Sequence, residues 1–234
     1  DLHSFPTRRS SDLSFMSNTG KGGLIGGAGG AALGALVGNL IGKDGKSTAI
    51  GAAIGTAVGA GAGILIGKKM DKAKAAAQAV KNAQVESITD ANGLQAVKMT
   101  FDSGILFNSG SSTLSAAAKN SLTTFANNVL RPFPDVDVAI VGHTDNTPYK
   151  GQTAAQREAS NQRISEQRAQ AVANYLYGLG ISSTQIRQVV GRGQSEPVAD
   201  NSTSAGKQLN RRTEVYLYAS QEMVQKANAG TLQY

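Results

Sequence analysis

The chain has 234 residues and a formal net charge of +7, and it contains no cysteine and two histidines. The lack of cysteine excludes disulfide bonds, thiolate metal sites and a cysteine nucleophile. Two histidines are too few for a histidine-rich metal centre. We therefore expect no metal and no cofactor, and the length allows one core of ordinary size plus an appendage.

The positive charge suits an anionic partner such as a cell-wall polymer, lipid headgroups or nucleic acid. Nucleic acid is the weakest of the three, because the sequence shows no zinc-ligand spacing, no aromatic ribonucleoprotein pattern and no dense Arg/Lys recognition helix. We expect no nucleic-acid partner.

Residues 1–13 do not resemble the start of a natural protein. They contain no apolar run and cannot act as a signal peptide. The stretch from His3 to Leu13 resembles one reading frame of a short-read sequencing adapter. We expect this segment to be a library artefact, so that any export signal or lipoprotein cysteine would lie in a missing natural N-terminus.

Residues 20–69 are rich in glycine and predict a hairpin of two apolar helices. Two uncharged stretches, 24–42 and 48–67, flank a short polar turn at 43–47, and glycine recurs every four residues along both. That spacing lines one helix face with residues that lack a side chain, so that two backbones can approach closely. A helix of 19 residues is roughly 29 Å long, close to the thickness of a bilayer.

So much glycine is costly in an isolated soluble helix, so a membrane or a tightly paired partner must compensate. We expect contact with membrane lipid and a homo-oligomer through this glycine zipper; the alternative is a flexible glycine-rich linker. The connector at 70–83 is rich in lysine and alanine. Its first lysines would lie at a membrane boundary and meet lipid phosphates, or else belong to a solvated helical connector.

Residues 84–220 read as a globular domain of alternating strands and helices. A turn at 90–93 separates two β-like runs, which predicts a hairpin over 84–101. Ser115 is expected to be the N-cap of a helix over 114–129, and alternation over 135–140 predicts a half-buried strand. The further expected elements are a helix over 164–179, strands over 186–190 and 213–218, and a C-terminal tail over 221–234. This order predicts an α+β fold, a sheet with helices packed on one face.

Four motifs in this domain occur in a characteristic order: Leu106–Ser111, Gly142–Asn146, Asn161–Val172 and Asn210–Glu214. Together they resemble the OmpA-like (OmpA/MotB C-terminal) peptidoglycan-binding family over about residues 101–218. With the glycine hairpin in front, the whole chain is most similar to outer-membrane lipoproteins of that family. The resemblance implies a βαβαβ two-layer domain with a mixed sheet.

The resemblance also implies a function, which is non-catalytic binding to peptidoglycan through the diaminopimelate of its stem peptides. Asp145 matches the family position that receives the ammonium group, and Arg168 matches the position whose guanidinium pairs with the carboxylate. The motif positions Thr144, Asn161, Arg211 and Arg212 are expected to contribute to binding, to orient the pocket or to brace the fold. The implied location is the bacterial outer membrane, with the C-terminal domain in the periplasm.

Two features depart from the family pattern. The loop at 147–156 is longer than usual, which suggests a lid on the pocket or a change in the stem peptide that fits. Gly110 stands where many members carry Asn or Asp, so one polar contact to the ligand is expected to be missing.

Three other functions fit parts of the sequence. An enzyme would need His143, Asp145 and a serine such as Ser165, but no nucleophile elbow surrounds them, and His143 is expected to support its loop. A flagellar stator would need an ionisable group inside the membrane, and neither apolar arm carries one. A membrane pore built from the glycine hairpin stays open as the alternative to a cell-wall tether.

Overall fold

The computed structural model describes residues 58–233, apart from 90–92, 109 and 148–150. The predicted glycine hairpin therefore lies largely outside the described residues, as does the adapter-like segment. In the part of the chain that is described, no helix is both long and apolar enough to cross a bilayer.

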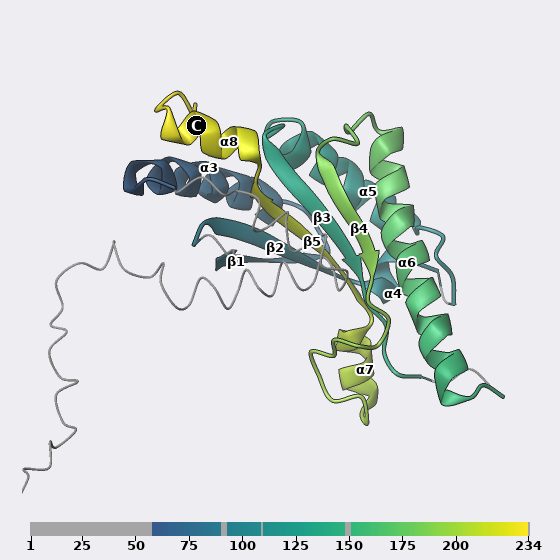
Figure 1. Cartoon of the computed structure of the whole chain (residues 1–234). Helices are drawn as coiled ribbons and strands as arrows, with labels where there is room; N and C mark the ends of the chain where they lie inside the picture. Colours follow the sequence, from purple (N-terminus) through teal and green to yellow (C-terminus); the bar gives the residue numbers. More distant parts are fainter. Residues whose placement is uncertain (1–57, 90–92, 109, 148–150, 234) are drawn as a thin grey trace, which may run out of the picture.

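A five-stranded mixed sheet forms the centre of the molecule, in the order β1-β2-β5-β3-β4 (Figure 1). Its strands are β1 (Ala83–Thr89), β2 (Gln95–Asp102), β3 (Val136–Gly142), β4 (Ile186–Gly191) and β5 (Arg212–Ala219). Only β3 and β4 run parallel among these neighbours; the other pairs are antiparallel. The hairpin predicted around residues 90–93 is confirmed as β1 and β2.

The helices that bury apolar side chains all contribute them to one cluster on one face of this sheet. They are α3 (Ala60–Gln78), α4 (Ser103–Leu106), α5 (Ala116–Phe125) with its π-helical continuation η1 (Ala126–Leu130), α6 (Ala154–Gly178) and α8 (Gln221–Asn228). A further short helix, α7 (Ser204–Asn210), precedes β5. The α+β fold with helices on one face is confirmed, and Ser115 is the N-cap of α5 as predicted, accepting from the Ala118 amide at 3.0 Å.

Helix α6 begins ten residues before the expected start. Thr153 and Gln156 form a capping box at its N-terminus, each side chain accepting from the other residue's backbone amide. The expected long loop at 147–156 is therefore shorter, because its last three residues are already helical.

The expected boundary between glycine hairpin and connector, at 69/70, falls inside a single helix. Ile66, Met70, Ala73 and Ala77 form one continuous buried stripe along α3, which packs on the sheet and on α8. Lys69, expected at a membrane boundary, pairs with Asp135 at 2.5 Å and donates to the backbone oxygen of Gln233. The helix continues because its apolar period continues past the last glycine.

The segment expected as a tail forms α8, which packs against α3 (Figure 1). Met223, Val224 and Ala227 are buried there, and Leu232 beyond the helix is buried as well. Ser220 caps the helix by accepting from the Met223 amide. The described domain thus extends at both ends beyond the expected 84–220.

The expectation that residues 135–140 form a half-buried strand is wrong, because both faces of β3 are covered. Val138 and Ile140 join the helix-side cluster, while Ala139 and Val141 are fully buried on the other face. There they pack with Tyr216 and Tyr218 of the neighbouring strand. The tyrosine side chains of β5 cover the small side chains of β3 on this face. The face that the alternating pattern predicted to be exposed is therefore buried.

Asp137 lies on this second face, opposite Tyr218 in the strand register, and forms an ion pair with Arg187 at 3.5 Å. Burial raises the pKa of Asp137 from 3.8 to about 6, and the charge of Arg187 offsets only part of that rise. An acidic side chain whose pKa is raised by folding contributes its full stabilisation of the folded state below its unfolded pKa of 3.8. That stabilisation is lost as the pH rises through the folded pKa of about 6.

We therefore expect Asp137→Asn to raise the free energy of unfolding at pH 7 by roughly 1–3 kcal/mol. The difference from the parent protein should disappear below about pH 4, where both side chains are neutral. Urea unfolding at a series of pH values measures this, with the exposed Glu222→Gln as the control. An Asn variant that is less stable than the parent at pH 7 would show that the ion pair with Arg187 outweighs burial.

Candidate functional site

The carboxyl ends of β3 and β4 meet the backbone of α6. Gly142 ends β3, and a Cβ atom there would lie 2.2 Å from the backbone oxygen of Ser165. Gly191 ends β4, and a Cβ atom there would lie 2.4 Å from the backbone nitrogen of Glu166. Glycine is required here because the helix and the strand ends approach so closely. This contact sets the spacing between the loop after β3 and the side chains of α6.

A cavity of about 460 Å³ opens beside this contact. Five of the six residues predicted to bind a ligand line it: Thr144, Asp145, Asn161, Arg168 and Arg211. The cavity is also lined by residues of the segment between β2 and α5, namely Ser103, Gly104, Phe107, Asn108 and Gly110. Thr147 and Ile164 complete the lining.

Asp145 provides a buried negative charge in this cavity. One carboxylate oxygen pairs with a terminal nitrogen of Arg211 at 2.5 Å, and the other accepts from the Thr147 amide at 2.8 Å. Burial alone would raise the pKa of Asp145, but the hydrogen bonds from Thr147 and Arg211 outweigh it and hold the pKa below its usual value. The carboxylate is therefore ionised at neutral pH.

Arg168 provides a positive charge on the α6 side of the same cavity. Its Nε atom donates to the backbone oxygen of Ser111 at 3.2 Å, and its guanidinium carbon lies 5.2 Å from the centre of the Phe107 ring. A hydrogen bond at the stem and a stacked ring together fix the orientation of the guanidinium plane.

Asn161 and Gly110 have local structural reasons for their positions. Asn161 is buried and donates to the Gln194 side chain at 2.9 Å, which ties α6 to the loop after β4. Gly110 has a φ of 67°. Asn and Asp are the residues other than glycine that best tolerate this left-handed region, so the departure from the family pattern preserves the backbone shape.

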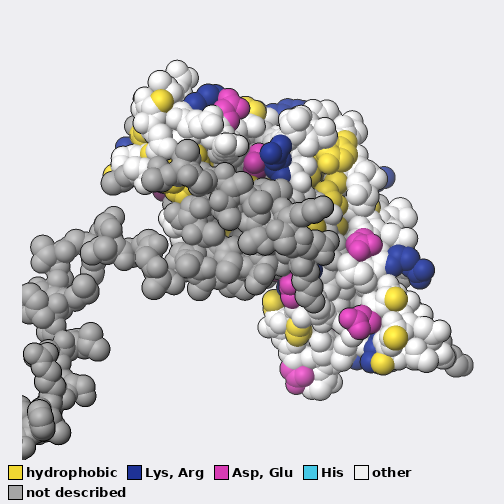
Figure 2. Space-filling model, in the orientation of Figure 1, with side chains coloured by type: hydrophobic (Ala, Val, Ile, Leu, Met, Phe, Trp, Pro, Cys, Tyr) yellow, Lys and Arg dark blue, Asp and Glu magenta, His cyan; other side chains and the backbone are white. Residues whose placement is uncertain are grey.

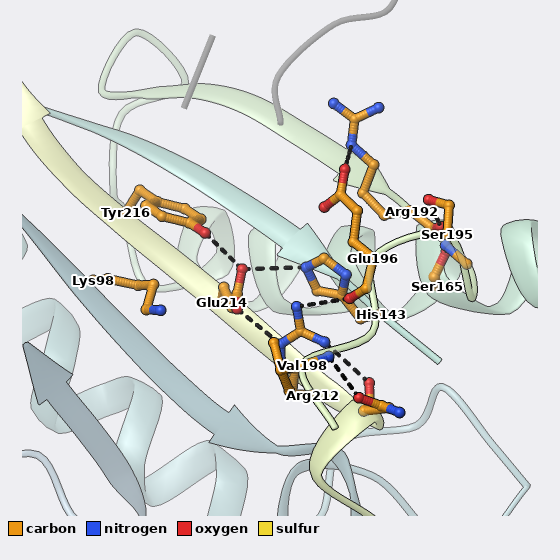
Figure 3. Close-up of polar contacts among 12 residues, drawn as sticks. Lys98, His143, Ser165, Arg192, Ser195, Glu196, Val198, Arg212, Glu214 and Tyr216 are labelled. Carbon is orange, nitrogen blue, oxygen red and sulfur yellow. Dashed lines mark hydrogen bonds and ion pairs between the residues drawn. The ribbon is translucent and has the colours of Figure 1, made fainter. Parts of the chain in front are cut away.

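Arg212 does not line this cavity, although its motif position predicted a role in binding or in bracing the fold. It is buried beside Glu214, to which its Nε donates at 2.8 Å (Figure 3). Residues two apart on a strand face the same side, and this places Arg212 with Glu214 and away from Arg211. Arg212 also donates to the backbone oxygens of Asn210 and Glu196, so it braces the fold.

Glu214 is the centre of a buried polar network that includes His143 (Figure 3). Its carboxylate accepts from Arg212, from the Tyr216 hydroxyl at 2.6 Å, and lies 3.2 Å from Nε2 of His143. Burial would raise the pKa of Glu214, but the hydrogen bond with His143 and the charge of Arg212 bring it well below its usual value. Burial and the charge of Glu214 raise the pKa of Tyr216 far above its usual value.

His143 links this network to the loop that carries Asp145. Its backbone amide donates to the Arg212 oxygen at 2.9 Å, and the next amide, of Thr144, donates to Gly193 at 2.8 Å. Ser165, the serine that an enzyme would need beside His143 and Asp145, donates to the Gln162 oxygen and accepts from the Gly193 amide. These bonds give His143 and Ser165 structural roles.

Sequence reasoning missed Ser103, which is 2% exposed and lines the cavity. A serine that follows a strand carries no motif of its own. Its backbone amide donates to the Arg211 oxygen at 3.0 Å, a long-range contact that only the structure shows.

Charges elsewhere on the described surface are mixed. On the face drawn in Figure 2, the coloured Lys and Arg side chains are interspersed with Asp and Glu. Among the described residues, no cluster of three or more His, Asp or Glu side chains is arranged to hold a metal ion.

Two segments of the chain are similar to known families. Residues 106–211 match the OmpA family, and residues 9–71 match the YMGG-like Gly-zipper. The chain is 37% identical over 119 residues to "Probable lipoprotein YiaD" of Escherichia coli, an alignment that covers 51% of this chain and 50% of that protein. It is also 37% identical to "Outer-membrane lipoprotein YfiB" of Pseudomonas aeruginosa, over 50% of this chain and 64% of the relative. The chain thus spans between half and two thirds of these relatives.

A solved structure shares the fold. The cell wall anchor of the T6SS from Pseudomonas aeruginosa superimposes with a TM-score of 0.51 at 26% sequence identity, covering 64% of this chain and 97% of the other. The similarity therefore extends over nearly the whole of that anchor domain.

Proposed function

We propose that this chain is a non-catalytic peptidoglycan-binding protein that tethers the outer membrane to the cell wall. Its residues 106–211 match the OmpA family, and its residues 9–71 match the YMGG-like Gly-zipper. The observation that carries the proposal is the pair of opposite charges, Asp145 and Arg168, in one cavity of about 460 Å³. A ligand that presents an ammonium and a carboxylate close together matches that pair.

Diaminopimelate in a peptidoglycan stem peptide is such a ligand. Its ammonium group binds the Asp145 carboxylate, which is ionised because its pKa is lowered. Its carboxylate pairs with the planar guanidinium of Arg168, which offers parallel N–H donors that a lysine lacks. Arg211 holds the Asp145 carboxylate in place, and Asn161 holds α6 against the loop after β4.

The glycine-rich segment supplies the membrane end of the tether. The part of the glycine-rich segment that precedes α3, residues 20–57, lies in or against the outer membrane, in contact with its lipid, and its glycine zipper pairs helices within one chain or between copies of it. The OmpA-family domain then lies in the periplasm, where it reaches the wall. The similarity to a probable lipoprotein and to an outer-membrane lipoprotein supports this arrangement.

A sedimentation assay on purified peptidoglycan tests the binding. We expect the full chain to sediment with the wall polymer, and free diaminopimelate to release it. The double variant Asp145→Ala, Arg168→Ala should bind at least about 10-fold more weakly, because two charge-assisted contacts are lost.

The matched control is the double variant Glu158→Ala, Arg163→Ala, which removes the same two charges from exposed positions on α6. It should bind like the parent chain. If the folded parent chain stays in solution, the proposed function fails and the glycine-rich segment becomes the place to look for function.

A further inference from the structure

A second hollow, which we call the α4–α7 groove, lies between the short helices α4 and α7. Its volume is about 350 Å³, within the range of about 300–1,000 Å³ that is usual for small-molecule sites. Both helices lie at the end of the sheet where β2 ends and β5 begins (Figure 1). The walls of the groove include Asp102, Ile105, Gln208, Leu209, Arg211 and Arg212.

The α4–α7 groove adjoins the cavity that contains Asp145 and Arg168. Arg211 lines both hollows. Gly104 lines the cavity and the next residue of α4, Ile105, lines the groove. The Cα atoms of consecutive residues are about 3.8 Å apart, so the groove is within reach of the next part of a ligand that is held in the cavity.

Two exposed apolar side chains belong to the groove. Ile105 is 39% exposed and Leu209 is 58% exposed. In the part of the chain that the structure describes, two further large apolar side chains are exposed, Ile64 and Val198. Single exposed apolar side chains are ordinary on a protein surface, but two that line one hollow offer apolar contact area to a ligand.

The charged side chains of the groove are already engaged inside the protein. Asp102 accepts from the Gly104 amide at 2.6 Å and from the Gln208 side chain at 3.0 Å. Arg211 pairs with Asp145, and Arg212 pairs with Glu214. A neutral ligand leaves these bonds in place. A carboxylate has about four acceptor sites, so Asp102 can also accept from a hydroxyl of such a ligand.

Peptidoglycan has a neutral group of this kind next to its stem peptide. The peptide is attached through a lactyl group to an N-acetylated sugar, which has an acetyl methyl group and apolar ring faces as well as hydroxyl and amide groups. Two residues separate this sugar from diaminopimelate, so the two lie within roughly 10 Å of each other. When diaminopimelate occupies the cavity, the sugar therefore lies close enough to reach the adjoining groove.

We propose that the α4–α7 groove binds the N-acetylated sugar to which the stem peptide is attached. Ile105 and Leu209 contact the apolar parts of the sugar, and Asp102 accepts from its hydroxyl groups. This inference rests on the proposed function and extends the ligand from a peptide to a peptide with its sugar. The groove thereby makes the protein prefer stem peptides that are attached to the glycan strand over free stem peptides.

Calorimetry on the full chain tests the proposal with two synthetic ligands that share one diaminopimelate stem peptide. One ligand carries N-acetylmuramic acid on the peptide, and the other carries only the lactyl group, so neither has a free N-terminal amine. The groove variants are Ile105→Thr and Leu209→Gln, which replace apolar surface by polar surface of similar size. Val198→Thr is the matched control, because Val198 is 59% exposed and does not line the groove.

We expect the parent chain to bind the sugar-bearing ligand about 10-fold more tightly than the lactyl ligand. Each groove variant should reduce this preference to about 3-fold or less, because apolar contact area is lost, and should bind the lactyl ligand as the parent does. Val198→Thr should keep the full preference. All three substitutions are at exposed positions, so the Tm of each variant should stay close to that of the parent.

The two ligands distinguish the possible failures. If the parent chain binds neither ligand, the proposed function itself fails. If it binds both equally well, the sugar site is overturned while the proposed function stands. A preference that both groove variants retain would place the sugar elsewhere on the protein. Groove variants that weaken both ligands alike would show that Ile105 and Leu209 act on the peptide. Either of these last two results also overturns the proposal.

Discussion

Replacing Glu214 by alanine is expected to lower the free energy of unfolding by about 3–5 kcal/mol, because it breaks a buried ion pair by removing one partner. Glu214 is 3% exposed and Arg212 is 5% exposed. Without the carboxylate, the Arg212 guanidinium, the Tyr216 hydroxyl and the His143 ring lose their shared acceptor in the protein interior (Figure 3). Urea unfolding followed by circular dichroism measures the change.

Measuring the free energy of unfolding at acid pH tests the role of Glu214 a second time. The pKa of Glu214 is well below its usual value in the folded protein. A carboxyl with a depressed pKa contributes stability that is present above its unfolded pKa, about 4.5, and is lost as the pH falls towards its folded pKa. The difference between the parent chain and Glu214→Gln, which cannot titrate, should therefore shrink below about pH 4.5.

The control is Glu222→Ala, which removes an exposed carboxylate from an i,i+4 pair with Lys226. Solvent screens that pair, so the unfolding midpoint should not move measurably. Equal effects of the Glu214 and Glu222 substitutions would contradict the assignment of Glu214 as the centre of the network.

The sequence predicted correctly those helices and strands whose features depend on residues close together in the chain. The turn at 90–93, the Ser115 cap and the period of the apolar residues in α5 each depend on neighbours within a few positions. The burial of both faces of β3 depends instead on the strand order, because β3 lies between β5 and β4 and is shielded by their side chains. No alternation within residues 135–140 contains that information.

The packing of α3 on α8 could not be predicted for the same reason. The two helices are far apart in sequence, and the backbone amide of Gly59 donates to the Asn228 side chain across 169 positions. Both segments were expected outside the domain, one as part of the hairpin and connector and the other as a C-terminal tail. Their apolar stripes are buried against the domain and against each other.

The candidate site shows a similar limit. The family motifs led to Asp145 and Arg168, and the structure brings both to one cavity. The motifs did not separate the adjacent residues Arg211 and Arg212, which face different environments. Strand β5 begins at Arg212, one residue before the expected start, and Glu214 two residues later therefore shares the side of Arg212.

The substitution Gly142→Ala is expected to disturb both stability and binding. A Cβ atom at this position would lie 2.2 Å from the Ser165 oxygen, and that oxygen belongs to the backbone of α6 and cannot swing aside like a side chain. The strand end and the helix must therefore separate. Overpacking of this kind lowers the free energy of unfolding by about 3 kcal/mol.

The same movement changes the cavity, because the two charged residues stand on the two elements that separate. Asp145 follows the end of β3, and Arg168 belongs to α6. A ligand that spans both charges binds best when their spacing matches its own, so a shift of about 1 Å should weaken binding to peptidoglycan by about 10-fold or more. The sedimentation assay at a temperature where the variant is folded measures this effect separately from stability.

Gly178→Ala is the matched control, because it makes the same substitution at the C-terminal end of α6, where the new Cβ would meet no atom within 4 Å apart from its chain neighbours and the backbone of its own helix turn. It should raise stability by about 0.5–1 kcal/mol, since alanine favours the helix over glycine, and leave binding unchanged. If Gly142→Ala loses stability but binds as the parent chain does, the spacing between Asp145 and Arg168 does not set affinity. The ligand would then be held by one of the two charges alone, and a peptide bearing only the matching group should bind as tightly as one with both.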